Sequence, residues 1–530
     1  MKVAPDKCRM MSLLSKWQKN KLLSVLIGLG VLSAFYFFAW WFESDRIYHP
    51  ALLVFLVLAI GYCAVQVFSG WYIFLQAEHI ETSEPAAGLT VDVFVPTYDE
   101  PLWVVERTLT AVLAMHYPHQ TYVLDDGRKA EYRELAKRLG ACYISRPTNE
   151  DHKAGNINHA LAHTNGEFIA IFDVDHVPAS SFLDRALGPF RDAKIGFVQV
   201  KLEHYNQGES FVAAAADQRN DGFFGAPMLG LNGCDCAQAF GSNCVFRRKA
   251  LEAIGGYKPG LAEDVDTSIH MHAAGWRSAY VPEALAEGLE PADLDGFFKQ
   301  QLKWSRGVFD LLFRVYPRLA KCLSLKMNVG YLWRLSCYLA GPMVLLQLLF
   351  TILALFLGVE TLTVYFAEYL IHQAPFVLIS SLIGFWADKR YHTVIHPSLA
   401  MPFGGLLLAY GTWPIYTLSF ICAIFGVKIP FMATPKQSTG GNSLNLIVPH
   451  IITVVLLLAA VAWRLSRGVD YYAAFICAFA LMNSVMHGGV FYAAWEGRRI
   501  ERSRNESNEK DRNGTSQGPP TEQLSSLKHR

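Results

Sequence analysis

Seven long apolar stretches dominate the hydrophobic pattern of the chain, two near its start and five in its second half. They cover residues 22–42, 51–76, about 332–358, 363–387, 400–427, 444–465 and 470–495. A helix that crosses a bilayer needs about 20 largely apolar residues, and each stretch is long enough. The pattern therefore predicts an α-helical transmembrane bundle built from both ends of the chain.

The segment between these two groups, residues 79–320, has a different pattern. Charges return, and short β-branched runs alternate with helix-like segments. The runs stand at residues 91–95, 120–124, 168–172 and 196–200. Short apolar runs separated by helical segments are typical of buried strands in a largely parallel sheet. We therefore expect a single α/β domain between the two groups of spans.

Basic residues gather before the first apolar stretch, whereas the short loop after it is mostly acidic. The basic residues are Lys2, Lys7, Arg9, Lys16, Lys19 and Lys21, and the loop carries Glu43, Asp45 and Arg46. Positive charge marks the cytoplasmic side of a span, so residues 1–21 are predicted to be cytoplasmic. Two spans within residues 22–76 then return the chain to the cytoplasm, which makes the α/β domain cytoplasmic as well.

The odd number of apolar stretches after the α/β domain conflicts with the charge of the C-terminal segment. Five spans would leave the C-terminus outside, but Arg498, Arg499, Arg502 and Arg504 favour the inside. One stretch should therefore lie in the membrane interface, and residues 400–427, broken by glycines and prolines, fit this best. Arg464 and Arg467 count against this assignment, because they would flank an external loop.

The resulting organisation has six spans and one interfacial segment. Two spans lie within residues 332–387, an interfacial segment with a loop occupies 397–440, and two spans lie within 444–496. The polar residues 497–530 are expected to form a disordered cytoplasmic tail. The overall composition agrees with a membrane protein, because 52% of the residues are hydrophobic and only 18% are charged. The net charge of +1 gives no basic field for nucleic acid.

Acidic side chains follow two of the predicted strands. Asp125 and Asp126 come after the run 120–124, and Asp173 and Asp175 come after the run 168–172. The carboxyl ends of parallel strands meet at one edge of a sheet, so these carboxylates are expected to share a cleft. A pair such as Asp173 and Asp175 can bind Mg²⁺ or Mn²⁺ together with diphosphate oxygens. Aspartates after strands also form turns and helix caps, so neither cluster alone identifies a site.

A third carboxylate pair, Glu263 and Asp264, opens a helix-like segment. Local sequence favours a helix cap for this pair. The functional alternative is a general base that accepts a proton from an attacking hydroxyl group.

Thirty-five residues separate Asp264 from the run Gln300-Gln301-Leu302-Lys303-Trp304. The ordered series of aspartates, followed by this spacing and run, resembles the signature of the family 2 processive glycosyltransferases, especially cellulose synthases. The stretches PTYDEP at 96–101, KAGNINHAL at 153–161 and FDVDHVP at 172–178 fit the same family. The resemblance implies a nucleotide-sugar-binding domain of the glycosyltransferase-A type.

The family resemblance also implies a role for each matching residue. The donor-binding residues would be Thr97, Tyr98, Glu100, Asp125, Asp126, Lys153, Asp173, Asp175 and Lys303, with Asp173 and Asp175 also holding Mg²⁺ or Mn²⁺. Asp264 would be the catalytic base, with Glu263 beside it, and Gln300 and Trp304 would bind the acceptor. Phe431, Thr434 and Lys436 resemble a gating loop that covers the bound nucleotide.

The expected function is that of a hexosyltransferase which polymerises glucose from UDP-glucose into a β-glucan by inversion and extrudes it. Its partners would be the UDP-sugar, the growing polysaccharide, the lipid bilayer of a bacterial inner membrane and an accessory export subunit. Ala262 replaces the usual threonine and Lys303 the usual arginine, which leaves the product open. The alternatives are a β-1,3-glucan or other β-linked polymer, transfer to a lipid-linked acceptor, and a transporter or inactive scaffold that only binds nucleotide-sugar.

Overall fold

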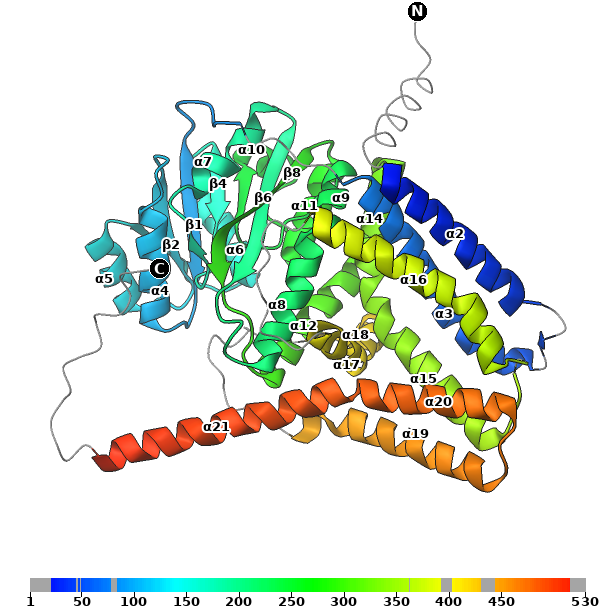
Figure 1. The fold of residues 1–530 in the computed structure, drawn as a ribbon. Helices are drawn as coiled ribbons and strands as arrows, with labels where there is room; N and C mark the ends of the chain where they lie inside the picture. The colour runs from blue at the N-terminus through cyan, green and yellow to red at the C-terminus, as the bar shows by residue number, and fades with distance from the viewer. Residues whose placement is uncertain are drawn as a thin grey trace, which may run out of the picture.

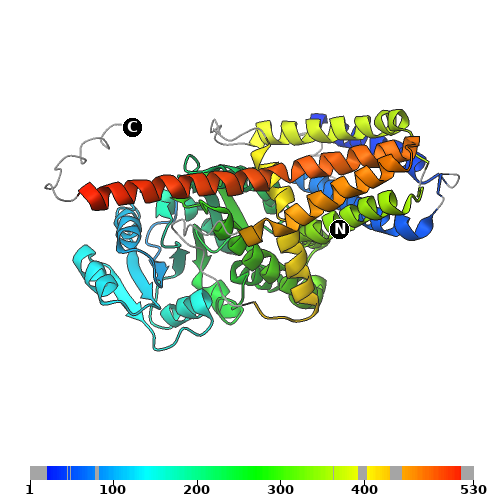
Figure 2. The ribbon, with the colours of Figure 1, turned by 90° about the horizontal axis from the view of Figure 1, so that it is seen from below.

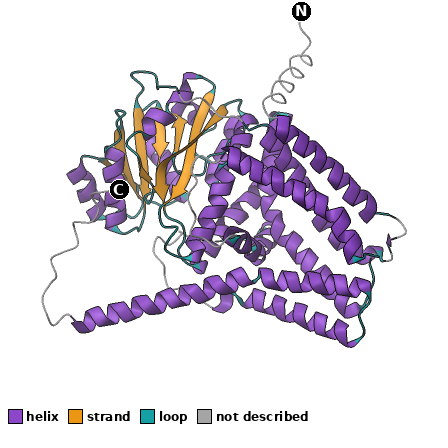
Figure 3. Cartoon of the chain, in the orientation of Figure 1, coloured by secondary structure: helices purple, strands orange, loops and turns teal. Residues whose placement is uncertain are grey.

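The chain forms an α/β domain joined to a bundle of long helices (Figure 1, Figure 3). The computed structural model describes residues 21–43, 46–47, 49–77, 83–361, 363–391, 403–429 and 444–514. The α/β domain is made by the middle of the sequence, and the bundle is made by the segments before and after it. This division agrees with the pattern of apolar and polar stretches.

Eight strands form one sheet, in the spatial order β3-β2-β1-β4-β7-β6-β8-β5. Their bounds are β1 Val91–Thr97, β2 Gln120–Asp125, β3 Cys142–Ser145, β4 Phe168–Ile171, β5 Val177–Pro178, β6 Ile195–His204, β7 Cys244–Arg247 and β8 Arg277–Gly288. The four predicted strands are confirmed as β1, β2, β4 and β6. Strands β3, β2, β1 and β4 run parallel, β7 is antiparallel to both of its neighbours, and β6 pairs with β8 in parallel.

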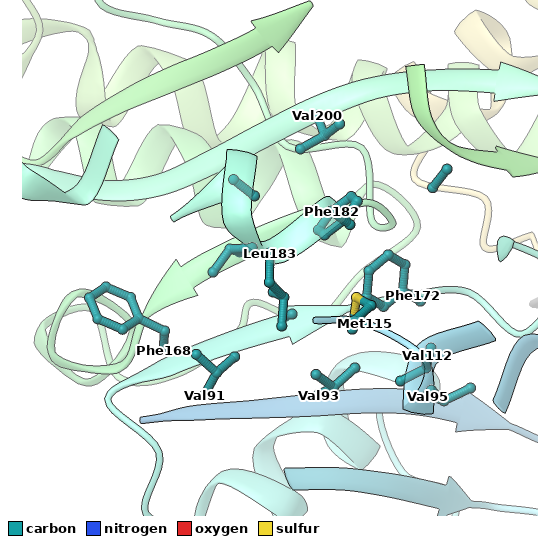
Figure 4. Packing of buried hydrophobic residues seen from close by; sticks show 14 of the residues in the cluster. Val91, Val93, Val95, Val112, Met115, Phe168, Phe172, Phe182, Leu183 and Val200 are labelled. Carbon is teal, nitrogen blue, oxygen red and sulfur yellow. The ribbon is translucent and has the colours of Figure 1, made fainter. Parts of the chain in front are cut away.

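The two faces of the sheet are both buried, because the strands are apolar on successive positions. Val91, Val93 and Val95 of β1 pack on one side with Val112, which is helical, and with Met115, which follows the same helix (Figure 4). Phe94 points to the opposite side, into a second apolar cluster. Helices on both faces are what a largely parallel sheet requires, and this layering leaves the carboxyl ends of the strands for polar side chains.

The helices of the α/β domain follow the strands in the order expected for this fold. Their bounds are α4 Leu102–Leu113, α5 Ala130–Leu139, α6 His152–Leu161, α7 Phe182–Ala186, α8 Phe211–Phe224, α9 Ala226–Gly233, α10 Arg248–Ala253, α11 Glu263–Ala273 and α12 Leu294–Asp310. After α12 the chain continues through a π-helical turn, Leu311–Val315, and α13 Tyr316–Leu319 into the bundle.

The remaining helices form the bundle. They are α2 Lys21–Trp41, α3 Pro50–Leu75, α14 Leu325–Ser336, α15 Ala340–Leu357, α16 Phe366–Tyr391, α17 Gly404–Gly411, α18 Trp413–Ile424, α19 Val448–Ser466, α20 Tyr471–Met486 and α21 Gly488–Gly514. Within the described residues, seven helical segments are long and apolar enough to cross a membrane. They coincide with the seven apolar stretches of the sequence.

The segment predicted to be interfacial differs in direction from the other long helices. It is divided at Thr412 into α17 and α18, which are seen nearly end-on in Figure 1 while α16, α19 and α20 lie across the view. The view from below shows the same pair running across the direction of α20 (Figure 2). By length and composition this segment could still span a membrane. Its placement in the interface, and with it the count of six spans, stays a prediction.

Residues 497–514, the first part of the segment predicted to form a disordered tail, belong to helix α21. Helix α21 extends to Gly514 and continues the line of α20 past the α/β domain (Figure 1, Figure 2). The segment 498–513 contains no proline or glycine and is rich in arginine and glutamate, which favour helix once an apolar anchor has nucleated it. Residues 515–530 lie outside the described part of the chain.

Helix α8 joins the sheet to the bundle through five consecutive polar residues. Three of these residues contact the sheet side: Asp217 contacts His204 of β6, Asn220 donates to Glu290, and Asp221 pairs with Lys201 of β6. The other two contact the bundle: Gln218 accepts from the backbone nitrogen of Gly405 in α17, and Arg219 donates to Tyr416 in α18. The helix thus contacts the sheet and the transverse helices α17 and α18 at the same time, which fixes the position of the sheet against these helices.

Candidate functional site

The ends of β1 and β2 bring together the first group of predicted donor-binding residues. Thr97 is paired in register with Asp125, and its hydroxyl donates to the carbonyl of Leu124 at 3.3 Å. The next residue, Tyr98, is exposed, and its backbone nitrogen donates to the Glu100 carboxylate at 2.8 Å. A polar, partly exposed edge therefore stands where the sequence predicts the nucleoside.

Asp125 is buried at the last position of β2 and organises the turn that follows. Its two carboxylate oxygens accept from the backbone nitrogens of Gly127 and Lys129, each at 2.7 Å. The hydroxyl of Tyr143 on β3 also donates to this carboxylate at 2.7 Å. Three donors stabilise the ionised carboxylate and hold the turn close to the end of β1.

Asp126 pairs with an arginine that the sequence did not single out. Arg146, directly after β3, donates from Nε and Nη2 to the two carboxylate oxygens of Asp126 at 2.6 and 2.8 Å. Both side chains are only 7% exposed. Arg146 also donates to the carbonyl oxygens of Glu150 and His152 before α6. The predicted donor-binding residue Asp126 therefore joins β2 to the start of α6 within the floor of the site.

A lysine and two carboxylates converge on one glycine beside the end of β4, and a third carboxylate contacts the lysine. Lys153 on α6 donates to Asp173 after β4 at 2.5 Å and to the carbonyl of Gly241 at 2.8 Å. A Cβ atom added to Gly241 would lie 3.1 Å from Nζ of Lys153, 3.4 Å from Asp264 and 3.9 Å from Glu263. Gly241 has a φ of +79°, so this close approach requires glycine.

The Lys153 ammonium group lies among carboxylates that favour its charge. Burial alone lowers the pKa of Lys153, but Asp173 and Glu263 outweigh it and raise the pKa above its usual value. Lys153 is therefore a fixed cation at the centre of the site, suited to binding a diphosphate.

Glu263 and Asp264 lie in the first turn of α11, and the interpretation of this pair as a helix cap is wrong. Ala262 occupies the N-cap position, and no side chain caps the helix there. Burial, together with the neighbouring Glu263 carboxylate, raises the pKa of Asp264 to about 7. A carboxylate with such a pKa is a stronger base than an ordinary aspartate and is still ionised in half or more of the molecules at neutral pH.

Helix α12 brings the run from Gln300 to Trp304 beside the start of α11. A Cβ atom on Gly307 would lie 2.7 Å from the backbone nitrogen of Ala262, so the two helices nearly touch at this glycine. Lys303 is close enough to lower the pKa of Asp264 through its charge, although burial dominates. Trp304 is partly buried and packs on an apolar cluster that continues into the bundle. The two distant motifs of the sequence therefore meet.

The carboxylates fit a divalent cation only in part. Asp173 is partly exposed and Asp175 is buried, two residues further along the same strand end. Within the described residues, no group of three or more histidine, cysteine, aspartate or glutamate side chains is arranged to hold a metal ion. Two carboxylates are hard oxygen donors suited to Mg²⁺ or Mn²⁺, provided that a diphosphate supplies further ligands.

Most of the predicted site residues lie together, and the structure adds others. The predicted gating-loop residues Phe431, Thr434 and Lys436 lie outside the described residues. Arg146 and Gly241 were missed, although the glycine in the run Ala239-Phe240-Gly241-Ser242 was a possible signal for a close approach. The hydroxyl of Ser242 accepts from the backbone nitrogen of Asp173 at 2.9 Å, so this run also supports the strand end that carries Asp173.

The sheet topology and the acidic edge define a glycosyltransferase domain of the nucleotide-sugar-binding α/β type. Residues 87–307 match the sequence model of the family described as "Glycosyltransferase like family 2". The α/β domain is therefore similar to the family 2 glycosyltransferases, and it is attached to helices that are long and apolar enough to cross a membrane.

Curated proteins that are similar to this chain include bacterial cellulose synthases. Cellulose synthase 1 of Komagataeibacter xylinus is 34% identical over 304 residues, which cover 56% of this chain and 19% of that protein. The UDP-forming cellulose synthase 1 catalytic subunit of the same organism is 36% identical over 259 residues, which cover 47% of this chain and 35% of that protein. The chain thus spans about a fifth to a third of the length of these relatives.

A solved structure supports the fold. The mannosyltransferase PcManGT from Pyrobaculum calidifontis, solved with GDP-Man and Mn²⁺, aligns with a TM-score of 0.51 at 14% identity. The alignment covers 71% of this chain and 99% of that protein. At this identity the likeness concerns the fold alone, and it includes part of the helical region as well as the sheet.

Proposed function

We propose that the protein is a membrane-embedded hexosyltransferase that extends a β-glucan from a UDP-sugar by direct, inverting transfer. The observation that carries this proposal is the convergence of Lys153, Glu263 and Asp264 on Gly241, with Asp173 paired to Lys153. A cation and an acidic edge suit a nucleoside diphosphate, and a carboxylate with a raised pKa suits an attacking hydroxyl group. The likeness to cellulose synthases supports glucose as the sugar.

The donor would lie along the ends of β1, β2 and β4. Thr97, Tyr98, Glu100 and Asp125 would hold the uridine, and Lys153 and Lys303 would contact the diphosphate. Asp173 and Asp175 would hold Mg²⁺ or Mn²⁺, which, when bound, offsets negative charge on the departing diphosphate. The Mn²⁺ present with the mannosyltransferase of similar fold supports this choice of cofactor.

The acceptor would approach from the bundle side, where α12 lies. Trp304 offers an indole face on which a sugar ring can stack, and Gln300 lies one turn before it. Asp264 would remove the proton from the terminal hydroxyl as that oxygen attacks the anomeric carbon and the diphosphate leaves. Direct displacement inverts the configuration, so an α-linked donor yields a β-linked product and requires no covalent nucleophile.

The membrane arrangement supports a processive enzyme that exports its product across a bacterial inner membrane. In this proposal the catalytic domain is cytoplasmic, the transverse pair α17 and α18 lies in the interface, and the loop after it closes over the nucleotide. An accessory subunit would continue the export path. A synthase of β-1,3-glucan or another β-linked polymer, and a non-processive transferase with a lipid-linked acceptor, are the competing functions within the class.

The test is polymer synthesis by the purified full chain in detergent, supplied with UDP-glucose and either Mg²⁺ or Mn²⁺. We expect an insoluble product that a β-1,4-glucanase digests, with activity lost on EDTA treatment and regained on addition of the metal. A product that only a β-1,3-glucanase digests would show that the enzyme is a β-1,3-glucan synthase. Incorporation of a single sugar into a lipid fraction would exclude polymerisation.

The pH dependence of the reaction should follow the ionisation of Asp264. The base must be ionised to accept a proton, so kcat/KM should be at its maximum about one pH unit above the pKa of Asp264, fall to half at about pH 7 and decrease further below it. In Glu263→Gln the like charge is removed, which lowers the pKa of Asp264 and moves this fall to a lower pH. Equal profiles for the two proteins would contradict the coupling of the two carboxylates.

A further inference from the structure

Arg334 is an arginine inside a helix that is apolar enough to span the membrane. It lies on α14, within the segment Leu325–Leu357. Ionisable residues in such segments are costly and are usually retained for a function, with an identifiable partner. Neither the motif analysis nor the family resemblance assigns this residue a role.

Aromatic rings surround the guanidinium group of Arg334. Its Cζ atom lies 5.3 Å from the ring centre of Phe223, 5.8 Å from that of Phe240 and 5.7 Å from that of Tyr338. We call these four residues the arginine–aromatic cluster. Tyr338 in turn packs edge-on against Tyr416 of α18, with ring centres 4.8 Å apart. The cluster therefore stands at the junction of the catalytic domain and the transverse helices.

The described residues use the hydrogen-bonding capacity of Arg334 only in part, and one of the partners is the side chain of Tyr338. Its Nη1 donates to the sulfur of Cys337 at 3.2 Å, which is a weak acceptor, and Nε is buried without a hydrogen-bond partner. No ion pair joins Arg334 to a carboxylate among the residues that the structure describes. A guanidinium group has five donors, and a buried donor without an acceptor costs free energy.

The arginine–aromatic cluster is next to the proposed reaction centre. Phe240 directly precedes Gly241, on which Lys153 and Asp264 converge. The charge of Asp264 interacts with that of Arg334 across this short distance. Trp304 packs on the same apolar cluster as Phe223, Phe240 and Tyr338. A buried donor among aromatic rings, close enough to Asp264 for their charges to interact, is the kind of group that a sugar-binding site requires.

We infer that Arg334 binds the acceptor, by donating hydrogen bonds from its guanidinium group to hydroxyl groups of the sugar that stacks on Trp304. This inference rests on the proposed function, and it assigns acceptor recognition to α14 as well as to α12. The planar fork of the guanidinium matches two neighbouring hydroxyl oxygens, whereas a lysine would offer a single point charge. The aromatic rings hold the fork in place without a carboxylate that would compete for its donors.

The test compares binding of cellotetraose and of UDP-glucose to the full-length protein in detergent by calorimetry. In Arg334→Met the dissociation constant for cellotetraose should rise roughly tenfold to a hundredfold, as expected for the loss of charged hydrogen bonds. The constant for UDP-glucose should change less than about twofold, because the donor site lies beyond Gly241. Arg334→Lys should fall between wild type and Arg334→Met.

Lys326→Met is the matched control. Lys326 lies on the same helix, but it is partly exposed and forms an ion pair with Asp235. The Lys326→Met variant should bind cellotetraose and UDP-glucose with the dissociation constants of the wild type. Equal cellotetraose binding by Arg334→Met and Lys326→Met would overturn the inference, and so would a parallel loss of donor and acceptor binding. A wild type that does not bind cellotetraose also overturns it. A wild type that binds cellotetraose but makes no polymer rejects the proposed function alone.

Discussion

Replacement of Asp264 by asparagine is expected to reduce the rate of sugar transfer by about 10²- to 10⁴-fold, the usual contribution of a general base. Asparagine has the same shape as aspartate but cannot accept a proton at neutral pH. The backbone nitrogen of Val265 donates to Asp264 at 2.8 Å, and an amide oxygen can accept this bond equally well, so α11 should remain intact. The measurement is UDP release by the purified protein, together with calorimetric binding of UDP-glucose, which should change only severalfold because the lysines and Asp173 remain.

Asp266→Asn is the control for this prediction. Asp266 belongs to the same first turn of α11, but it pairs with His270 at 2.8 Å. Loss of that pair removes a similar charge without touching the residues around Gly241. Transfer by Asp266→Asn should stay close to wild type. If Asp264→Asn retained more than about a tenth of the wild-type rate, another group would have to be the base.

The strands that sequence predicted were those with continuous apolar runs. Strands β1, β2, β4 and β6 are buried at most of their positions on both faces, so most of their residues are apolar or β-branched. Strands β3 and β7 have only four residues each, and β8 includes Pro282 and two glutamates, so their patterns are weak. They become strands because they pair with neighbouring strands of the sheet. Those neighbours are far away in sequence, so a local pattern does not predict the pairing.

The same limit applies to the site. The carboxylates at strand ends were predictable, because parallel topology places those ends at one edge. The partners of these carboxylates were not. Arg146 is 20 residues from Asp126, and Gly241 is 88 residues from Lys153. Arg334 lies in a stretch whose apolar character predicts only a membrane helix. Charge pairing and close packing between distant segments depend on the folded geometry.

Removal of Arg146 should destabilise the protein more than removal of any exposed charge. In Arg146→Met the carboxylate of Asp126 would stay in a nearly fully buried position without its partner, and the carbonyl oxygens of Glu150 and His152 would lose a donor. Breaking one side of a buried ion pair costs about 3–5 kcal/mol. For a domain of this size we expect the midpoint of thermal unfolding in detergent to fall by roughly 10 °C.

Two further variants identify the cause of this effect. The pair of Arg138 and Glu106 has a similar distance, 2.8 Å, but its side chains are 61% and 42% exposed, so Arg138→Met should cost less than about 1 kcal/mol. Adding Asp126→Asn to Arg146→Met removes the unpaired charge and should recover part of the lost stability. If Arg146→Met unfolded no earlier than Arg138→Met, the ion pair would contribute nothing to the floor of the site. If the double variant recovered nothing, the loss would instead come from the backbone contacts of Arg146, and the turn before α6 would be the element that it supports.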